Sequence, residues 1–280
     1  MRFAVDVPNF GRWSDPREVA AFARSLEEAG WDGFSIWDHI LVADGLEVAD
    51  PWICLAAAAA STSRITLMTM VTPVPRRTPW KLARECVTLD HLSGGRFVLG
   101  VGIGWPTDPE FTRFGGPTDL RTRADMLDEG LVVLEGLWSG EPFEHHGEHY
   151  DLERVHFLPR SVQEPRIPIW VAGMWPRRRP FRRAARYEGV APIVVDDDGE
   201  FIALTPGTMA EIVRYVAGRR TGGGDYAFAA SGFAFGERDP VPVLREMAAA
   251  GATWWREGWW PGTIDHDDWV ERLLEGPPRL

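Results

Sequence analysis

An acid and an imidazole stand side by side after a short apolar run. Asp38 and His39 directly follow Ser35-Ile36-Trp37. A histidine exchanges a proton near neutral pH, so His39 is a candidate catalytic acid or base. Asp38 is a candidate either to share that chemistry or to orient His39. The structural alternative for both is a loop hydrogen bond or a turn cap.

A second group of residues suits the binding of a flat or anionic ligand. Gly100, Gly102 and Gly104 alternate along the chain, which leaves one strand face without side chains for a ligand or a neighbouring backbone. Further on, Val171-Ala172-Gly173-Met174-Trp175 leads into a run of arginines. A glycine turn that enters a helix beside guanidinium groups favours phosphate. Arginines paired with surface carboxylates are the alternative.

Three further histidines suggest a metal site by composition. His145, His146 and His149 lie within five residues of one another, but one helical face would have to present them, and Pro142 and Gly147 oppose a helix. We therefore expect no metal. The competing hypothesis is a metal-dependent barrel hydrolase that uses Asp38, His39 and these histidines.

Composition limits the partners. The 280 residues are 45% apolar and 25% charged, with a formal net charge of −11. This charge disfavours nucleic acid and anionic lipid surfaces, which need clustered positive charge. The longest near-continuous apolar run, Trp52 to Ala60, is about half of the ~20 residues that a membrane helix needs. Met1-Arg2 runs directly into a strand-like segment, and Cys54 and Cys86 have no paired spacing. We expect a cytoplasmic enzyme with no membrane segment.

The elements that position these residues alternate between two types. Capping residues followed by proline mark five helix starts, at Asp15, Asp50, Thr78, Thr205 and Asp239. Strands are predicted at 3–7, 33–37, 65–71, 97–102, 167–172, 189–195, 226–233 and 252–257. Helices are predicted at about 15–29, 51–62, 79–92, 121–138, 177–187, 206–217, 240–250 and 267–275.

Eight strand–helix units in one chain predict an α/β fold, a single (β/α)8 TIM barrel over residues 1–280. An open doubly wound sheet is the alternative, but the first turn, Pro8 to Gly11, lacks the glycine-rich dinucleotide pattern. An insertion between the fourth and fifth units, at about 139–166, carries several prolines and predicts a hairpin or a lid over one barrel face. Catalytic residues of such barrels follow the carboxyl ends of the strands, where Asp38 and His39 stand.

These residues carry a family resemblance. The stretch from Ile65 to Trp105, which includes Leu-Asp-x-Leu-Ser-x-Gly-Arg at 89–96, resembles the bacterial luciferase-like monooxygenase superfamily. Similarity continues at Trp37-Asp38-His39, at Glu110-Phe111 with Phe114-Gly115, and from Ile167 to Gly173.

The resemblance implies FMN or a deazaflavin (coenzyme F-420) at the carboxyl-end mouth of the barrel, with His39 near the reactive ring edge. It implies a non-prolyl cis peptide at the end of the third strand, around Val71-Thr72. It also implies a small-molecule substrate, a homodimer and, for some members, a separate flavin reductase. The implied cofactor-binding residues are Thr69, Val71, Thr72, Gly102, Trp105, Gly173, Met174, Trp175 and Arg177.

The chain departs from its relatives at one informative position. The sugar-phosphate dehydrogenase branch has a glutamate after its fourth-strand glycines, where this chain has Trp105, so a sugar phosphate is a less favoured substrate. We expect a flavin-dependent oxidoreductase or monooxygenase that uses reduced FMN with oxygen, or reduced deazaflavin. A non-catalytic cofactor-binding subunit is a further alternative.

Overall fold

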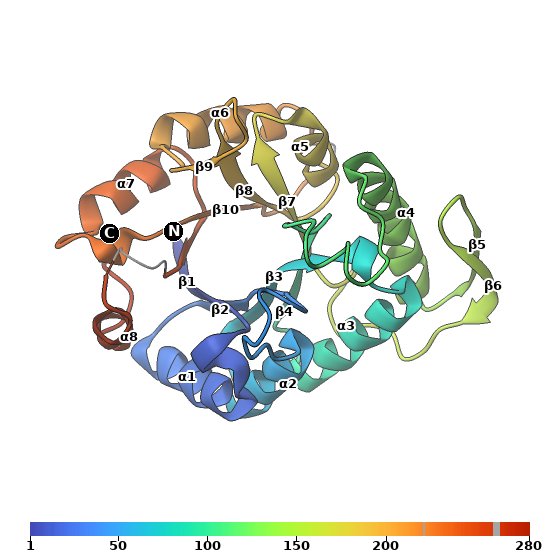
Figure 1. Ribbon diagram of the computed structural model, residues 1–280, viewed down its shortest axis with the longest axis horizontal. Coiled ribbons are helices and arrows are strands. Elements are labelled where there is room, and N and C mark those ends of the chain that lie inside the picture. Colours follow the sequence, from blue (N-terminus) through green and yellow to red (C-terminus); the bar gives the residue numbers. More distant parts are fainter. Residues whose placement is uncertain (221, 260–263) are drawn as a thin grey trace.

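The computed structural model describes residues 1–220, 222–259 and 264–280. Within these ranges, eight parallel strands close into a barrel with helices around it (Figure 1), and the predicted TIM-barrel fold is confirmed. The pairing order is β10-β11-β1-β2-β3-β4-β7-β8, and a β10–β8 contact closes the ring. The barrel strands are β1 (Arg2–Val7), β2 (Gly33–Ile36), β3 (Thr66–Pro73), β4 (Phe97–Gly102), β7 (Ile169–Trp175), β8 (Gly189–Val195), β10 (Ala227–Gly232) and β11 (Trp254–Glu257).

The eight helices found in the described ranges match the predicted ones to within a few residues. They are α1 (Pro16–Ala29), α2 (Pro51–Ser61), α3 (Pro79–Ser93), α4 (Leu120–Trp138), α5 (Arg178–Ala184), α6 (Pro206–Ala217), α7 (Val241–Ala249) and α8 (His266–Leu274). The largest differences are in α5, which ends at Ala184 and not at 187, and in β7, which runs from Ile169 to Trp175 and not over 167–172. No helix in the described part of the chain is both long and apolar enough to cross a bilayer.

Local chemistry explains where the helices begin and end. The Asp15 carboxylate accepts a hydrogen bond from the Arg17 amide, and the Asp50 carboxylate accepts from Trp52 and Ile53. Each satisfies amides that a helix start leaves without partners, and the following proline loses no bond there. Helix α1 ends at Gly30, whose φ of 96° is a left-handed conformation that favours glycine.

The barrel interior changes from apolar to polar along its axis. One buried cluster inside the barrel contains Ala4, Met68, Trp170 and Trp254. Because side chains alternate along a strand, the next inward positions on the neighbouring strands β11, β1 and β2 are Arg256, Asp6 and Ser35. They lie nearer the carboxyl ends. The larger core lies between the barrel and the helices.

Strand β3 is irregular beside the glycines of β4. Its register with β4 shifts between Thr69 and Thr72, and the Met70-Val71 peptide is cis. The cis bond was expected one residue later, so that position is corrected. A Cβ at Gly100 would lie 1.9 Å from the Thr69 carbonyl oxygen. Gly100 is therefore required by the backbone of β3, and not by a ligand.

We expect Gly100→Ala to destabilise the fold by about 3 kcal/mol or more, because a backbone atom cannot move away as a side chain can. Urea unfolding at equilibrium measures the change. Gly222→Ala is the control, since a Cβ at Gly222 meets nothing within 4 Å. Equal midpoints for the two variants would contradict the assignment.

The segment at 139–166 forms a hairpin of β5 (Pro142–His146) and β6 (Asp151–His156). It lies outside the helical ring, at the right of Figure 1, and packs on α3 and α4. Arg84 and His91 of α3 bond the carbonyl oxygens of Leu158 and Arg160. The hairpin does not cover the barrel mouth, so the predicted hairpin is present and the lid over a barrel face is not.

Candidate active site at the barrel mouth

His39 lies just beyond β2 at the carboxyl-end mouth and contacts a glutamate from another loop. Its Nδ1 is 3.1 Å from Oε1 of Glu110, which follows β4. A carboxylate accepts hydrogen bonds, so the proton of this pair belongs on Nδ1. His39 Nε2 has no hydrogen bond to any described residue, and its side chain is 20% exposed. The imidazole is thus oriented at one nitrogen and available at the other.

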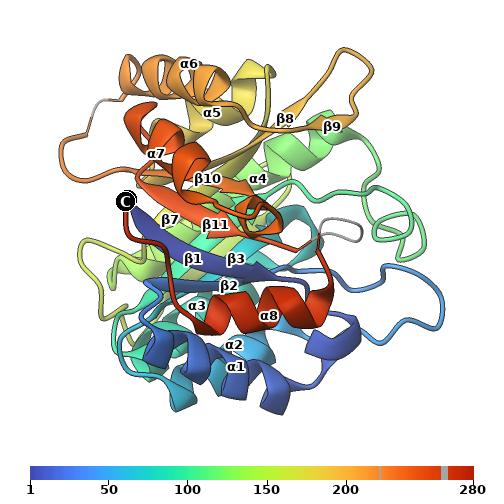
Figure 2. The same ribbon diagram turned by 90° about the vertical axis from the view of Figure 1, so that its left-hand side faces the viewer.

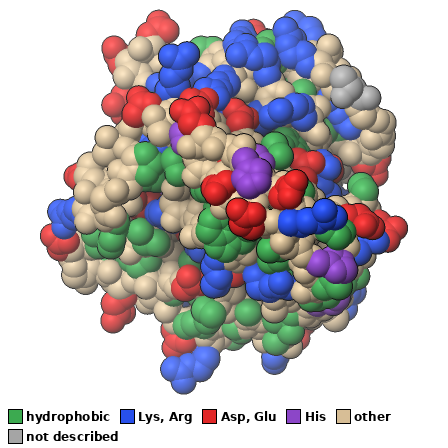
Figure 3. Space-filling view, turned by 90° about the vertical axis from the view of Figure 1, so that its right-hand side faces the viewer, with side chains coloured by type: hydrophobic (Ala, Val, Ile, Leu, Met, Phe, Trp, Pro, Cys, Tyr) green, Lys and Arg blue, Asp and Glu red, His purple; other side chains and the backbone are tan. Residues whose placement is uncertain are grey.

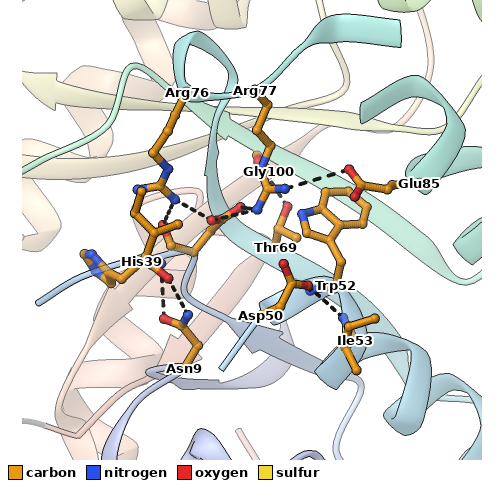
Figure 4. A network of polar contacts seen from close by, with 12 residues as sticks. Asn9, His39, Asp50, Trp52, Ile53, Thr69, Arg76, Arg77, Glu85 and Gly100 are labelled. Carbon is orange, nitrogen blue, oxygen red and sulfur yellow. Dashed lines mark hydrogen bonds and ion pairs between the residues drawn. The ribbon is translucent and has the colours of Figure 1, made fainter. Parts of the chain in front are cut away.

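The Asp38 carboxylate is bonded to two arginines and not to His39. Arg76 Nη2 donates to the Asp38 carboxylate and to its backbone oxygen, and Arg77 Nη2 donates at 2.8 and 3.0 Å. The Asp38 side chain is fully buried. The Asp38 carboxylate is therefore bonded to these arginines and not to the His39 ring, and it holds the segment after β3 against the end of β2. A catalytic role for Asp38 stays a prediction. Figure 4 shows Arg76 and Arg77 side by side near His39.

The His39 backbone is held from the other side by Asn9, which is fully buried. Asn9 Nδ2 donates to the carbonyl oxygens of His39 and Ala49, each at 2.7 Å, and the His39 amide donates to Asn9 Oδ1 (Figure 4). The rings of Phe10 and Trp37 contact the imidazole edge to face, with centroids about 6 Å away. Asn9 had no assigned role in the sequence, because only the fold brings residue 9 beside residue 39.

Glu110 connects His39 to the arginines. Its side chain is 1% exposed; Oε2 accepts from Arg76, and Oε1 accepts from the Ile40 amide at 2.8 Å. Burial by itself would raise the pKa of Glu110, but the hydrogen bond from His39 and the Arg76 charge lower it below its ordinary value. Glu110 is therefore ionised at neutral pH, as an orienting acceptor must be.

Glu110 is a candidate site residue to which the sequence alone assigns no role. Its signal in the sequence is the family similarity at Glu110-Phe111. The structure brings this acid to His39 from five positions after Trp105 in the same loop.

The predicted cofactor-binding residues on and after β3 and β4 do not all face the barrel interior. Val71 packs against the interior cluster, and a Cβ at Gly102 would lie 2.8 Å from Val71 Cγ2. Thr69 lies between two interior methionines and so points to the other face, where its hydroxyl donates to the Gly100 carbonyl. Thr72 is buried, and its hydroxyl has no described partner. Trp105 lies beyond β4 and is 55% exposed.

Gly173, Met174 and Trp175 belong to strand β7, so the turn predicted there is wrong. A Cβ at Gly173 would lie 2.6 Å from Pro180 of α5, which shows that this glycine permits close packing of helix on strand. Trp175 also points to the helices, where it contacts Phe181 and Tyr215. Met174 alternates with them and faces inward. Arg177 is exposed at the start of α5.

Most of the arginine cluster after β7 is structural. Arg179, Arg183 and Arg186 all pair with Asp128 of α4. Arg178 instead stacks 3.7 Å from the Trp175 ring centroid. Only the arginines outside these ion pairs remain candidates to bind a phosphate. Of these, Arg177 lies nearest the mouth.

A buried ion pair lies on the inner wall below the mouth. Arg256 Nη1 is 2.7 Å from Asp6 Oδ2, and Ser35 donates to Asp6 Oδ1 at 2.7 Å. Burial raises the pKa of Asp6, an effect that the Arg256 charge opposes. Arg256 Nε is buried with no partner among the described residues. It is a buried donor whose hydrogen-bonding capacity is unused among these residues.

Glu257 is an acid at the end of β11, and its burial leads to a prediction about pH. It is fully buried and accepts from the Ala234 and Phe235 amides and from Trp255 Nε1. Burial raises its pKa to about 8, although these donors lower it. A carboxyl whose folded pKa exceeds its unfolded value loses stabilising free energy as pH rises between the two.

We expect the free energy of unfolding of the wild type to fall, relative to Glu257→Gln, by ~2–4 kcal/mol between pH 5 and pH 8. The Glu257→Gln variant lacks the titrating carboxyl, so it is the reference for the wild type. Denaturant unfolding across this range measures the difference. A difference that does not change with pH would contradict the buried, protonated state of Glu257.

The histidines of the hairpin do not come together. His145 pairs with Glu129 of α4, and His146 pairs with Asp151. Figure 3 views this side of the molecule and shows exposed histidines as separate patches beside acidic side chains. Among the described residues, no three His, Cys, Asp or Glu side chains are arranged to hold a metal ion. The hydrolase hypothesis has no supporting geometry in those ranges.

The fold is a parallel barrel, and its carboxyl-end mouth holds an oriented histidine. Together these define a class of barrel enzymes that can move a proton at the mouth. Comparison with protein families is more specific. Residues 4–235 match the model of the luciferase-like monooxygenase family, and the chain belongs to this family.

Curated relatives match only part of the chain. An uncharacterised protein of Mycobacterium tuberculosis is 41% identical over 126 residues, 45% of this chain and 43% of the relative. An F420-dependent glucose-6-phosphate dehydrogenase of Beutenbergia cavernae is 32% identical, over 58% of this chain and 48% of its own length. A 4-hydroxyprotoasukamycin monooxygenase of Streptomyces nodosus subsp. asukaensis is 32% identical, over 66% and 48%. The matches thus span about half the length of these relatives.

Solved structures confirm the fold over almost the whole chain. An F420-dependent secondary alcohol dehydrogenase, in complex with an F420-acetone adduct, superposes with a TM-score of 0.76 at 17% identity, covering 98% of this chain and 96% of its own. The oxygenating constituent of 3,6-diketocamphane monooxygenase from Pseudomonas putida, in complex with FMN, gives 0.73 at 18% identity with the same coverage. These relatives are F420- and FMN-dependent oxidoreductases of one barrel type.

Proposed function

We propose that this chain is an oxidoreductase that binds FMN or the deazaflavin F420 across the barrel mouth and acts on a small organic substrate. The observation that carries the proposal is the His39–Glu110 pair, in which Nδ1 is held and Nε2 is unbonded to described residues. The family and the F420- and FMN-dependent relatives support the redox chemistry.

The residues at the mouth fit such a cofactor. A flat ring needs an apolar support with little side-chain bulk, and Val71 beside Gly102 provides one. Ring carbonyl oxygens need donors, and Arg256 Nε is a buried donor without a described partner. Thr72 has a buried, unbonded hydroxyl on the same strand as Val71. Arg177, exposed at the start of α5, is the proposed partner of a cofactor phosphate, and Trp105 and Met174 are proposed to lie beside the cofactor.

The cofactor supplies the two-electron step, either as a hydride or together with oxygen. The chain supplies proton transfer and position. His39 holds or accepts the proton at Nε2, and Glu110 orients the ring through Nδ1, which suits a group that gives a proton to a substrate oxygen or removes one. Asp38, through Arg76, keeps Glu110 in place. A homodimer, a cytoplasmic location and, for FMN, a separate reductase belong to this proposal.

Titration of the purified protein with FMN and with F420, followed by cofactor fluorescence and tryptophan quenching, tests the proposal. We expect one of the two to bind with a Kd at or below the micromolar range. Binding of F420 alone assigns hydride transfer, and binding of FMN alone assigns oxygenation. Binding of neither would overturn the proposal and would favour a different enzyme class.

A further inference from the structure

A groove lies between helices α5 and α6, outside the barrel strands. Helix α6 follows β8 by way of the short strand β9 (Phe201–Ile202), and α6 contacts α5. Both helices lie at the top of Figure 1 and of Figure 2, on the opposite side of the barrel from β2. His39 follows β2, so this groove is separate from the candidate active site.

Arginine side chains dominate the wall of the groove, which we call the arginine groove. Its volume is about 470 Å³, which falls in the range of about 300–1,000 Å³ typical of small-molecule sites. Three arginines, one acid and two aromatic residues line it: Arg178, Arg214, Arg219, Glu211, Trp175 and Tyr215. Within the described ranges, no carboxylate forms an ion pair with any of the three arginines. The groove thus has two more positive than negative charges.

Other arginines of the same helix are arranged differently. Arg179 and Arg183 lie on the side of α5 that faces α4, and both pair with Asp128. Acids outnumber bases in the whole chain, which has a formal net charge of −11. Figure 3, in which α5 and α6 are again at the top, shows Lys and Arg side chains gathered there. The unpaired arginines are therefore a local feature of one surface and not a consequence of composition.

Aromatic rings hold two of the guanidinium groups in place. Arg178 Cζ lies 3.7 Å from the Trp175 ring centroid and 4.7 Å from that of Tyr215. Arg219 Cζ lies 3.7 Å from the same Tyr215 centroid. One ring thus keeps two like charges close together, although they repel each other. An anion beside them would gain free energy from both.

The donors of these arginines are largely unused. A guanidinium has five N–H donors in its own plane, and stacking on a ring leaves that plane open. Among the described residues, the side chains of Arg178 and Arg214 donate no hydrogen bond. Arg219 donates one, from Nη1 to the Tyr215 carbonyl oxygen at 3.1 Å. The groove therefore offers both charge and directed donors to a ligand.

We propose that the arginine groove binds the phosphate group of a small molecule, independently of the proposed function. Two phosphate oxygens accept parallel N–H bonds from one guanidinium, and this geometry favours arginine at phosphate sites. A phosphate dianion balances the excess positive charge of the groove. An uncharged ligand would leave that charge and most of the donors without partners. The volume of the groove suits a small molecule and not a folded protein.

Calorimetric titration of the purified protein with inorganic phosphate, diphosphate and citrate, at low ionic strength, tests the proposal. We expect diphosphate to bind with a Kd below about 1 mM and more tightly than citrate. Arg178→Gln combined with Arg214→Gln is expected to weaken diphosphate binding about tenfold or more. The control combines Arg154→Gln with Arg245→Gln, exposed positions on β6 and α7 that change the net charge equally. Its diphosphate affinity should equal that of the wild type.

Three results would overturn the proposal: no diphosphate binding to the wild type, tighter binding of citrate, or equal weakening in the two double variants. Arg177→Gln supplies a fourth. If this variant alone lost diphosphate binding, the anion would belong at the start of α5 beside the mouth and not in the groove. The titrations with FMN and F420 are read separately, so the proposed function stands or falls without reference to these results.

Discussion

Replacing His39 with glutamine is expected to lower turnover about 10²- to 10⁴-fold, the usual contribution of a general acid or base. Glutamine keeps a polar side chain near Glu110 but cannot exchange a proton. The cofactor dissociation constant should change less than threefold, because the backbone of residue 39 is held by Asn9. Single-turnover kinetics and the fluorescence titration measure the two quantities on the same preparation.

Glu110→Gln is the companion variant for His39. It retains the shape of the side chain but replaces one acceptor oxygen with an amide donor, so the imidazole loses the carboxylate that orients it through Nδ1. The expected result is a smaller loss of turnover than in His39→Gln. Unaltered turnover in His39→Gln would refute the proton-transfer role and favour a non-catalytic cofactor-binding subunit.

Asp38→Asn is expected to have the largest effect on stability, a loss of about 3–5 kcal/mol in the free energy of unfolding. The substitution leaves the largely buried Arg76 and Arg77 without the carboxylate that both contact. Asparagine also presents an amide donor to these donors. Denaturant unfolding of the variant and the wild type at neutral pH gives the difference.

Asp44→Asn provides the matched control for Asp38→Asn. Asp44 also pairs with an arginine, Arg113, but both side chains are mostly exposed. Water screens such a pair, so the control should stay within about 1 kcal/mol of the wild type. If the two variants lost equal stability, the Asp38 network would not be the determinant that its burial indicates.

Local interactions explain why much of the fold was predictable. Asp15 and Asp50 cap their helices through amides two or three residues away, so a few letters determine each helix start. The order of strands and helices is likewise a property of the chain, and eight alternations leave few architectures. The position of His39 at the mouth followed from the end of β2 alone.

Contacts between distant segments account for what was missed. His39 and Glu110 are 71 residues apart, and Arg76 reaches Asp38 across 38. Arg183 lies among the arginines after β7, and its partner Asp128 of α4 is 55 residues away in the sequence. The glycines after Leu99 left two alternatives, a ligand or a neighbouring backbone, and at Gly100 the bulged backbone of β3 is the close neighbour.

The sequence by itself determined the barrel class, the approximate helix and strand positions and the histidine that follows β2, because each depends on residues close along the chain or on simple alternation. Only the tertiary structure decided which side chains are already paired. This pairing decides which groups are free to act on a ligand. His39 Nε2 and Arg256 Nε have no described partners, whereas the Asp38 carboxylate is paired with two arginines. A carboxylate's role depends on the charges beside it, and the parallel pairing of β2 with β3 brings Arg76 and Arg77 to Asp38.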